Sequence, residues 1–574
     1  MLALCALASL AILTRLVVSC RYGIDLTDES FYLAWMRAPA RYRSSVLLFG
    51  FVYHPLYVLC AGSVTLLRRV NVVATFLLAL PPCFLAVPAS TARVLRAAWA
   101  AALAVSVLLI FHVWLPAPSY NGLALHALLV AATALLLPRP AAGVRPALLM
   151  GLAGWMAYMA KPTTAVALGF VLLLWAIGTG AMRRGQLLLA GALAAGGVVA
   201  SALAIDGSLG AHVARLDRGA ALLRLLDAGH TISNLVRWEG VALGARAFLL
   251  VLAGAGLVAL ATVLVAGGRP WARGAGLGAS ALTASAALLA VTTGWAPADI
   301  HPLDGLQLLA APLGLAAAAA FERGRPSPRA DVALVAVLFL FPFVHAFGTS
   351  GSYWAGAAKA PFFWLLAALV VVRGRAAFTW PSLLPAAAHS LVVTAVLLSI
   401  ALAHPTRQPQ ALALDTWPDE LGSPGRPIVV AEATGVYLAR LRAAAGAAGF
   451  QPGDPMIDLT GHAPGALYAL EAHALGQPWL IGGYAGSPAF ARAALDDEPC
   501  ERLARSWVLT EERGPRRLPA EVLLRYGIDV RHDLVSAGAV AAPPGEYARP
   551  YGQRLLKPLR SPEAALQACR DARR

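Results

Sequence analysis

Long apolar runs separated by short, arginine-bearing turns dominate the first 400 residues. The first run covers residues 2–18, and further runs lie near 46–67, 70–90, 97–115, 123–137, 147–160, 163–180, 186–205, 241–266, 275–295, 305–321, 331–348, 361–372 and 382–403. A helix of about 20 residues crosses the hydrocarbon core of a bilayer. Only 13% of the 574 residues are charged, against about a quarter in a soluble protein. The chain is therefore predicted to be a polytopic α-helical membrane protein.

Arginines recur in every second turn of the later part of this region and predict its orientation. They are Arg139 with Arg145, Arg183 with Arg184, Arg269 with Arg273, Arg323 to Arg329, and Arg373 with Arg375. By the positive-inside rule these turns are cytoplasmic. The turns at 116–122, 161–162, 206–240, 296–304 and 348–360 then face outward, as does the tail from His404.

The run at 46–67 is the exception to this alternation. With the N-terminus inside, fourteen crossings would return the tail to the cytoplasm. Residues 46–67 are interrupted by Gly50, His54 and Pro55, so this run is expected to be a juxtamembrane or re-entrant piece. About 13 transmembrane helices remain, forming a membrane module over residues 1–403.

The tail, residues 404–574, has a different pattern. Strands are predicted at 427–431, 455–459, 479–481 and 507–510, with helices at 435–449, 465–475 and 488–496 between them. Alternating strands and helices predict a small α/β domain. Cys500 and Cys569 both lie here; an extracytoplasmic tail would allow a disulfide between them, and two free thiols are the alternative.

The first predicted outer loop, residues 19–57, carries an unusual concentration of acids and aromatics. Asp25, Asp28 and Glu29 lie within five positions, and an aromatic helix from about Glu29 follows them. Carboxylates at a membrane surface are costly unless they are paired, metal-bound or used in chemistry. This loop is therefore predicted to contain the functional site of the chain.

Three motifs resemble the GT-C superfamily of integral-membrane glycosyltransferases. Asp28-Glu29-Ser30-Phe31-Tyr32 is similar to the acidic motif in the first outer loop of these enzymes. Tyr53-His54-Pro55-Leu56-Tyr57 stands where they place a Pro-Leu-Tyr turn, and residues 116–121 stand where an outer substrate segment occurs. The layout is similar to that of the protein O-mannosyltransferases and the lipid A aminoarabinose transferases.

The resemblance implies transfer of a sugar from a polyprenyl-phosphate-linked donor to a hydroxyl acceptor. Asp28 matches the position of the general base, and Glu29 would orient that base or the acceptor. Displacement with a single base implies inversion at the anomeric carbon. The acceptor class stays open between a lipid, a polysaccharide and a protein.

The remaining candidate residues would bind the substrates. Lys161, the only lysine among residues 1–300, suits the leaving phosphate, and His54 is a further phosphate candidate. Tyr32, Tyr53, Tyr120 and Asn121 complete the predicted substrate-binding set.

Each of these residues has a structural alternative. Asp28 and Glu29 suit a helix N-terminus, Lys161 suits a snorkelling position, and the aromatic residues suit an interfacial belt. Tyr120 and Asn121 suit a helix start.

The cofactor requirement stays open between a divalent metal and none. Asp299, His301 and Asp304 are read either as a metal cluster or as a solvated loop.

Other function classes fit the sequence less well. A transporter or flippase of a lipid-linked or polar solute is the alternative, but such proteins concentrate ionisable groups near the bilayer midplane, whereas here they concentrate in loops. The net charge of +16 lies largely in the turns, and no nucleic-acid-binding motif accompanies it. The expected location is a bacterial inner membrane, with the tail extracytoplasmic.

Overall fold

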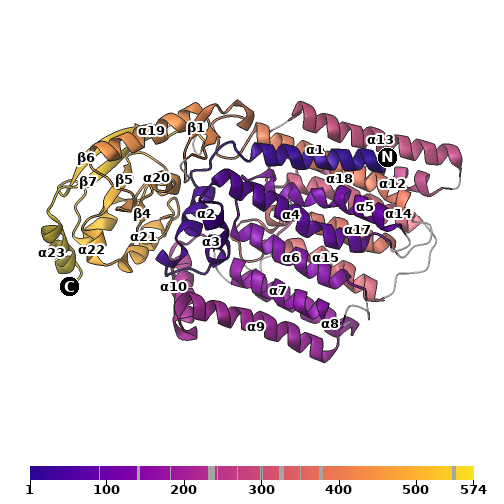
Figure 1. Ribbon diagram of the computed structural model, residues 1–574, viewed down its shortest axis with the longest axis horizontal. Helices are drawn as coiled ribbons and strands as arrows, with labels where there is room; N and C mark the ends of the chain where they lie inside the picture. Colours follow the sequence, from indigo (N-terminus) through magenta and orange to yellow (C-terminus); the bar gives the residue numbers. More distant parts are fainter. Residues whose placement is uncertain are drawn as a thin grey trace.

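A bundle of long apolar helices and a smaller α/β domain make up the protein (Figure 1). The computed structural model describes residues 1–88, 91–138, 143–180, 182–229, 239–241, 243–267, 269–297, 299, 301–321, 329–349, 351–373, 379–422, 425–545 and 551–574. The domain lies at the end of the bundle where the first helix finishes, and this is called the domain end below.

Within the described residues, nine helices are long and apolar enough to span a membrane. They are α1 (Leu2–Ser19), α4 (Val64–Ala86), α5 (Arg93–Ala104) continued by η2 (Val105–His112), α8 (Pro162–Thr179), α9 (Arg184–Asp206), α12 (Ala245–Ala266), α13 (Pro270–Thr293), η3 (Asp304–Leu309) continued by α14 (Ala310–Phe321), and η4 (Trp380–Leu383) continued by α18 (Leu384–Ala403). The shorter helices α6 (Tyr120–Leu136), α7 (Arg145–Ala160), α15 (Arg329–Ala346) and α17 (Phe362–Arg373) lie among them (Figure 1). The prediction of many long apolar helices followed by a small domain with a sheet is confirmed, whereas the membrane location and the count of 13 spans stay predictions.

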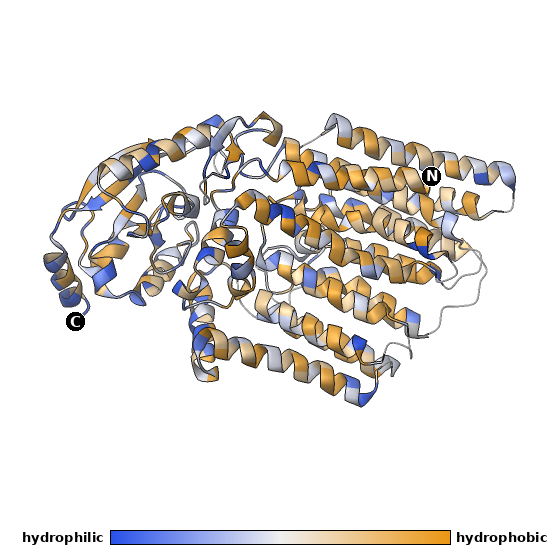
Figure 2. Cartoon of the chain, viewed as in Figure 1, coloured by the Kyte–Doolittle hydropathy of each residue, from blue (hydrophilic) through white to orange (hydrophobic). Residues whose placement is uncertain are grey.

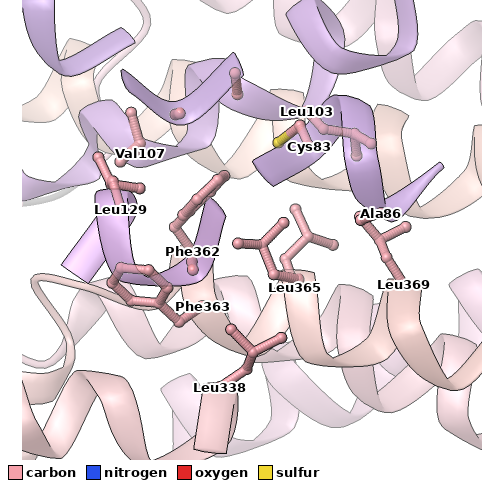
Figure 3. Close-up of a cluster of buried hydrophobic side chains, with 14 of the residues drawn as sticks. Cys83, Ala86, Leu103, Val107, Leu129, Leu338, Phe362, Phe363, Leu365 and Leu369 are labelled. Carbon is pink, nitrogen blue, oxygen red and sulfur yellow. The ribbon is translucent and has the colours of Figure 1, made fainter. Parts of the chain in front are cut away.

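Apolar side chains fill the centre of the bundle. Phe362 and Phe363 of α17 pack beside Leu338 of α15 and Leu129 of α6 (Figure 3). The helices of the bundle consist mostly of apolar residues, whereas the domain mixes polar and apolar residues (Figure 2), and many large apolar side chains of the bundle are exposed. A helix that is apolar on all sides suits a lipid environment.

Arginine-bearing turns gather at the end of the bundle away from the domain. Arg145, Arg184 and Arg373 stand at the ends of α7, α9 and α17 there (Figure 1). Arg139, Arg323, Arg325 and Arg375 lie outside the described residues.

Shorter helices cover the domain end. They are α2 (Asp28–Arg37), η1 (Pro39–Arg41), α3 (Phe49–Leu59), α10 (Leu209–Leu225) and α16 (Tyr353–Ala357). The run expected at 46–67 divides here: α3 has 11 residues, too few to cross a bilayer at 1.5 Å per residue. A turn at Ala61 and Gly62, both with positive φ, separates α3 from α4.

The tail forms a five-stranded sheet in the order β4-β3-β5-β7-β6. The strands are β3 (Pro455–Asp458), β4 (His473–Ala474), β5 (Trp507–Glu511), β6 (Leu534–Ala541) and β7 (Gly552–Pro558); β3 runs parallel to β4 and β5, and β7 runs antiparallel to β5 and β6. A separate pair joins β1 (Trp417–Asp419) to β2 (Ile428–Val430). The helices are α19 (Glu432–Ala447), α20 (Pro464–Ala469), α21 (Ser487–Asp496), α22 (Cys500–Leu503) and α23 (Pro562–Ala572), with the short η5 (Leu412–Leu414) and η6 (Ala520–Tyr526).

One predicted strand of the tail is wrong. Residues 479–481 are irregular, and β4 lies earlier, at His473–Ala474. The Trp479 indole donates a hydrogen bond to the Gly461 carbonyl, and Leu480 is buried in the domain core. The apolar residues of this stretch are therefore explained by their burial in the domain core, and they form no strand.

The Cys500–Cys569 disulfide forms and joins α22 to α23. It closes a separation of 69 residues, so it ties the last helix to the body of the domain. The alternative of two free thiols is thereby excluded.

The domain packs directly on the first loop. Tyr22 forms a parallel bridge with Val429, and the Gly465 amide donates to the Leu26 carbonyl. One buried apolar cluster contains Leu33 and Met36 of α2 together with Leu467 of α20. The first loop therefore folds as part of the interface between bundle and domain.

Candidate functional site

A buried ion pair fixes the start of the first loop. Arg68 of α4 donates from Nε and Nη2 to the two carboxylate oxygens of Glu29, at 2.7 and 2.6 Å. Its remaining donors bond the carbonyls of Cys20, Tyr22 and Gly23 at 2.8–2.9 Å. All the N–H groups of the guanidinium are used, and both side chains are almost fully buried. Glu29 therefore holds the loop in position, away from solvent.

Asp28, the next residue toward the N-terminus, remains accessible. Its side chain is 24% exposed, and one carboxylate oxygen lies 2.6 Å from Nη1 of Arg407. The same Nη1 lies 3.4 Å from the Asp25 carboxylate. Arg407 stands four residues after the end of α18 and has a φ of 57°, a conformation that L-residues seldom adopt outside functional or over-determined sites.

Asp25 lies beneath Asp28 and is buried. Its carboxylate accepts a hydrogen bond from the Thr27 amide at 2.8 Å. Burial raises the pKa of Asp25 to about 7, although Arg407 opposes this rise. Of the three loop acids, Asp28 is thus the one that a ligand can reach.

Two lysines face the same region. Lys161 lies between α7 and α8, is 4% exposed, and donates from Nζ to the His345 carbonyl at 2.8 Å. Lys359 lies between α16 and α17, with Nζ 3.6 Å from the centre of the Trp114 ring. Neither lysine has a carboxylate within 4 Å among the described residues.

The charges of Asp28 and the two lysines act on one another. Burial lowers the pKa of Lys359 to about 8, and the Asp28 charge acts on it in the opposite direction. Burial, followed by the Lys359 charge, lowers the pKa of Lys161 to about 7. Asp28 therefore acts on Lys359, and Lys359 acts on Lys161.

Two tyrosines complete the surroundings of Asp28. The rings of Tyr32 and Tyr120 meet edge to face at 5.8 Å, and Lys161 Nζ lies 5.9 Å from the Tyr120 ring. Burial raises the pKa of Tyr32 well above its usual value, and the charges of Asp28 and Asp25 add to the rise. Asp28, Tyr32, Tyr120 and Lys161 are therefore the predicted residues that the structure brings together.

The other predicted residues support the loop. His54 Nδ1 lies 2.7 Å from the Met36 carbonyl, at the end of α2. The Tyr53 hydroxyl lies 3.5 Å from His126 Nδ1 and is buried. Asn121 is buried in the first turn of α6, and its carbonyl lies 3.2 Å from His345 Nε2. The Asn121 side chain hydrogen-bonds Tyr120 of the group around Asp28, whereas the contacts of Tyr53 and His54 are with His126 and Met36.

Three residues of this region were not predicted from the sequence: Arg68, Lys359 and Arg407. Lys359 and Arg68 each carry a sequence signal that could have identified them. The chain has three lysines, and two of them, Lys161 and Lys359, meet here. Arg68 is a charge close to an apolar run, a position that usually marks a buried partner.

An apolar groove adjoins the site at the domain end. It lies between Leu16 of α1, Phe111 of η2 and Leu398 of α18. One wall is formed by Trp114, whose ring contacts Lys359 Nζ. Another wall is formed by Pro405 and Thr406, which precede Arg407 in the chain.

In the part of the chain that the structure describes, no group of three or more His, Cys, Asp or Glu side chains is arranged to hold a metal ion. Among the three residues that could be either a metal cluster or a solvated loop, Asp304 accepts from the His301 amide at 2.7 Å, and Asp299 lies 3.2 Å from His404. The geometry is that of a loop held by its own hydrogen bonds.

Comparison with known proteins gives no match: no family model, no curated protein and no solved structure is similar to this chain.

Proposed function

We propose that the protein is a membrane glycosyltransferase of the GT-C type, which moves a sugar from a polyprenyl-phosphate-linked donor to a hydroxyl acceptor. The observation that carries the proposal is the meeting of one accessible carboxylate, Asp28, with the cations Lys161, Lys359 and Arg407. A carboxylate serves as the base, and the two lysines, which have no carboxylate within 4 Å among the described residues, suit a phosphate.

In the proposed reaction the acceptor hydroxyl gives its proton to Asp28 as its oxygen attacks the anomeric carbon. The bond between that carbon and the phosphate oxygen breaks, and polyprenyl phosphate leaves with the bonding electrons. Lys161 and Lys359 stabilise the charge that develops on the phosphate. Attack from the face opposite the phosphate inverts the anomeric centre.

Arg407 interacts both with the base, Asp28, and with the donor phosphate in the proposed reaction. It pairs with Asp28 at 2.6 Å. A donor phosphate competes for the guanidinium, since bidentate pairing with phosphate is a strong interaction. Donor binding then releases Asp28 to act on the acceptor. Glu29, held by Arg68, positions Asp28 and does not contact substrate.

The groove beside the site supports a lipid donor. Its lining from α1 and α18 is mainly apolar, and its walls end at the neighbours of Lys359 and Arg407. An isoprenoid chain in the groove would bring its phosphate toward both cations. A soluble nucleotide-sugar donor would leave this apolar surface without a purpose.

The proposed location is a bacterial inner membrane, with thirteen bundle helices crossing it and α3 remaining at the surface. The positive-inside rule favours a cytoplasmic position for the arginine-bearing end. The Cys500–Cys569 disulfide favours an oxidising compartment for the domain. Lipid-linked donors would then be used on the outer face.

Substitution of Asp28 tests the proposal. In Asp28→Asn, transfer from a polyprenyl-phosphate sugar should fall by at least about a thousandfold, because the base is lost while size and shape are kept. Asp299→Asn is the matched control, since this acid lies in another loop with its side chain 92% exposed. Full transfer by Asp28→Asn, with the same thermal stability as the control, would refute the assigned role.

A further inference from the structure

The turn between α3 and α4 exposes large apolar side chains at the domain end of the bundle. Val58 is 60% exposed and Leu59 is 82% exposed, and Ala61 and Leu66 are exposed close to them in the chain. Residues 58–66 are called the α3–α4 corner below. An exposed apolar surface of this kind marks contact with a membrane or with a partner.

The corner is held rigidly against the domain. The φ of Gly62 is 72°, and a Cβ at this position would lie 2.3 Å from the Gly422 carbonyl oxygen, so only glycine allows the two chains to approach. The hydroxyls of Tyr57 and Tyr468 lie 3.0 Å apart beside this contact. The apolar side chains of the corner therefore project from a fixed turn.

The corner continues the exposed apolar face of α4. Leu66, Val73 and Leu77 are exposed and, together with Arg69, are spaced by three or four residues, which places all four on one face of the helix. Because α4 is long and apolar enough to span a membrane, this face suits lipid chains. Arg69 stands within two turns of the start of α4, and helical side chains lean toward the N-terminus of their helix. Its guanidinium therefore extends toward the domain end, at the level of the corner.

Two arginines without acidic partners adjoin the corner. Arg69 Nε donates to the Val17 carbonyl at 3.4 Å, and Arg426 Nη1, from the domain, donates to the Cys60 carbonyl at 3.4 Å. Both arginines are exposed, and neither has a carboxylate within 4 Å among the described residues. Their remaining donors face outward from the protein.

Two acids that precede Arg426 in the chain have other partners. Asp419 is bound by Arg442 at 2.8 Å, and Glu420 accepts from the Gly425 amide at 3.0 Å. Positive charge therefore remains beside an apolar tip. Segments that lie in the interface of an acidic membrane combine these two features.

We propose that the α3–α4 corner inserts into the bilayer interface and that Arg69 and Arg426 bind the headgroups of acidic phospholipids there. The apolar tip reaches the start of the acyl chains, and the two guanidinium groups pair with lipid phosphates. Because Arg69 belongs to the bundle and Arg426 to the domain, acidic lipid holds both parts at one membrane surface. The proposal rests on the membrane location of the bundle and not on the transfer reaction at Asp28.

A fluorescent label on the full-length protein in nanodiscs tests this surface. In Leu59→Cys the new thiol is exposed, whereas the four native free thiols are buried, so bimane attaches at position 59. The nanodiscs contain equal amounts of phosphatidylglycerol and phosphatidylcholine, and the chains of one lipid or of the other carry bromine, which quenches the label. The ratio of the two quenching constants should show phosphatidylglycerol enriched by about fivefold or more at the corner, since each arginine near an acidic surface contributes about fivefold.

Matched variants show whether the two arginines cause the enrichment. Arg69→Gln combined with Arg426→Gln should make the two quenching constants equal. Arg145→Gln changes an exposed arginine at the other end of the bundle and should leave them unequal. The same label in Leu77→Cys, two turns beyond Arg69 on the same face of α4, should be quenched equally by both lipids.

Three outcomes would overturn the proposal. The first is no quenching at position 59 by either lipid, which would place the corner in water or, if the protein dimerises, against a second copy. The second is equal quenching by both lipids in the protein with native arginines. The third is an undiminished excess of phosphatidylglycerol in the double arginine variant at native thermal stability. None of these measurements involves sugar transfer, so failure of the transferase proposal and failure of this one are distinguishable.

Discussion

Replacing Arg68 by methionine should destabilise the first loop by about 3–5 kcal/mol, because Glu29 would remain buried without its partner. In the native protein Arg68 is 0% exposed and makes two bonds to Glu29 and three to backbone carbonyls of residues 20–23. Methionine fills much of the same volume but supplies no donor. The loss is therefore electrostatic and not a packing loss.

The double variant Glu29→Leu with Arg68→Met separates the two contributions. Removing both charges avoids the unpaired carboxylate and should recover up to about 2 kcal/mol of the loss. The rest stays lost, because the carbonyls of Cys20, Tyr22 and Gly23 still lack their donor, at about 1 kcal/mol each. The free energy of unfolding of loop and domain, from urea titrations followed by tryptophan fluorescence, gives the coupling energy. Additive effects of the two substitutions would refute the assigned ion pair.

Three further predictions concern the site and the domain. Lys359→Gln and Lys161→Gln should each raise the KM for the donor about 10–100-fold with little change in thermal stability, whereas Lys557→Gln, which changes the third lysine, should leave the KM unchanged. Because the pKa values of Lys161 and Lys359 lie at about 7 and 8, their charge is present below this range and is lost as the pH rises through it. Donor affinity should therefore fall between pH 7 and pH 9, and a flat profile in wild type would contradict the assignment. Replacing Cys500 and Cys569 by serine should destabilise the domain by about 4 kcal/mol, as expected for a loop of this length, and an unchanged urea midpoint would contradict that.

Membrane-type helices were the most predictable part of the fold. Apolar length and arginine spacing are local signals, and the predicted run at 186–205 corresponds closely to α9, Arg184–Asp206. The same signals identified α3 as the run that differs, since Gly50 and Pro55 interrupt it. The α/β character of the tail also followed from local patterns, but β6 and its neighbour β7 were missed, since β6 is rich in Ala and Gly, which are weak strand formers.

The site was predictable only in part. Asp28 and Lys161 carry sequence signals of their own, a motif and a rare residue type. The roles of Arg68 and Arg407 depend on contacts 39 and 379 residues distant in the chain, to Glu29 and Asp28. Glu29 and Asp28 are adjacent in the sequence, yet Glu29 is buried against Arg68 and Asp28 is only partly buried beside Arg407. Only the three-dimensional packing of α4 and the tail distinguishes them.

Transfer by the purified protein tests the central claim most directly. Nanodiscs containing the protein, a polyprenyl-phosphate sugar labelled in the sugar and a hydroxyl acceptor should release one polyprenyl phosphate for each sugar transferred. Asp28→Asn should neither transfer the sugar nor release polyprenyl phosphate above background. Movement of the labelled lipid across a proteoliposome membrane, with no transfer of its sugar, would contradict the account and favour a flippase.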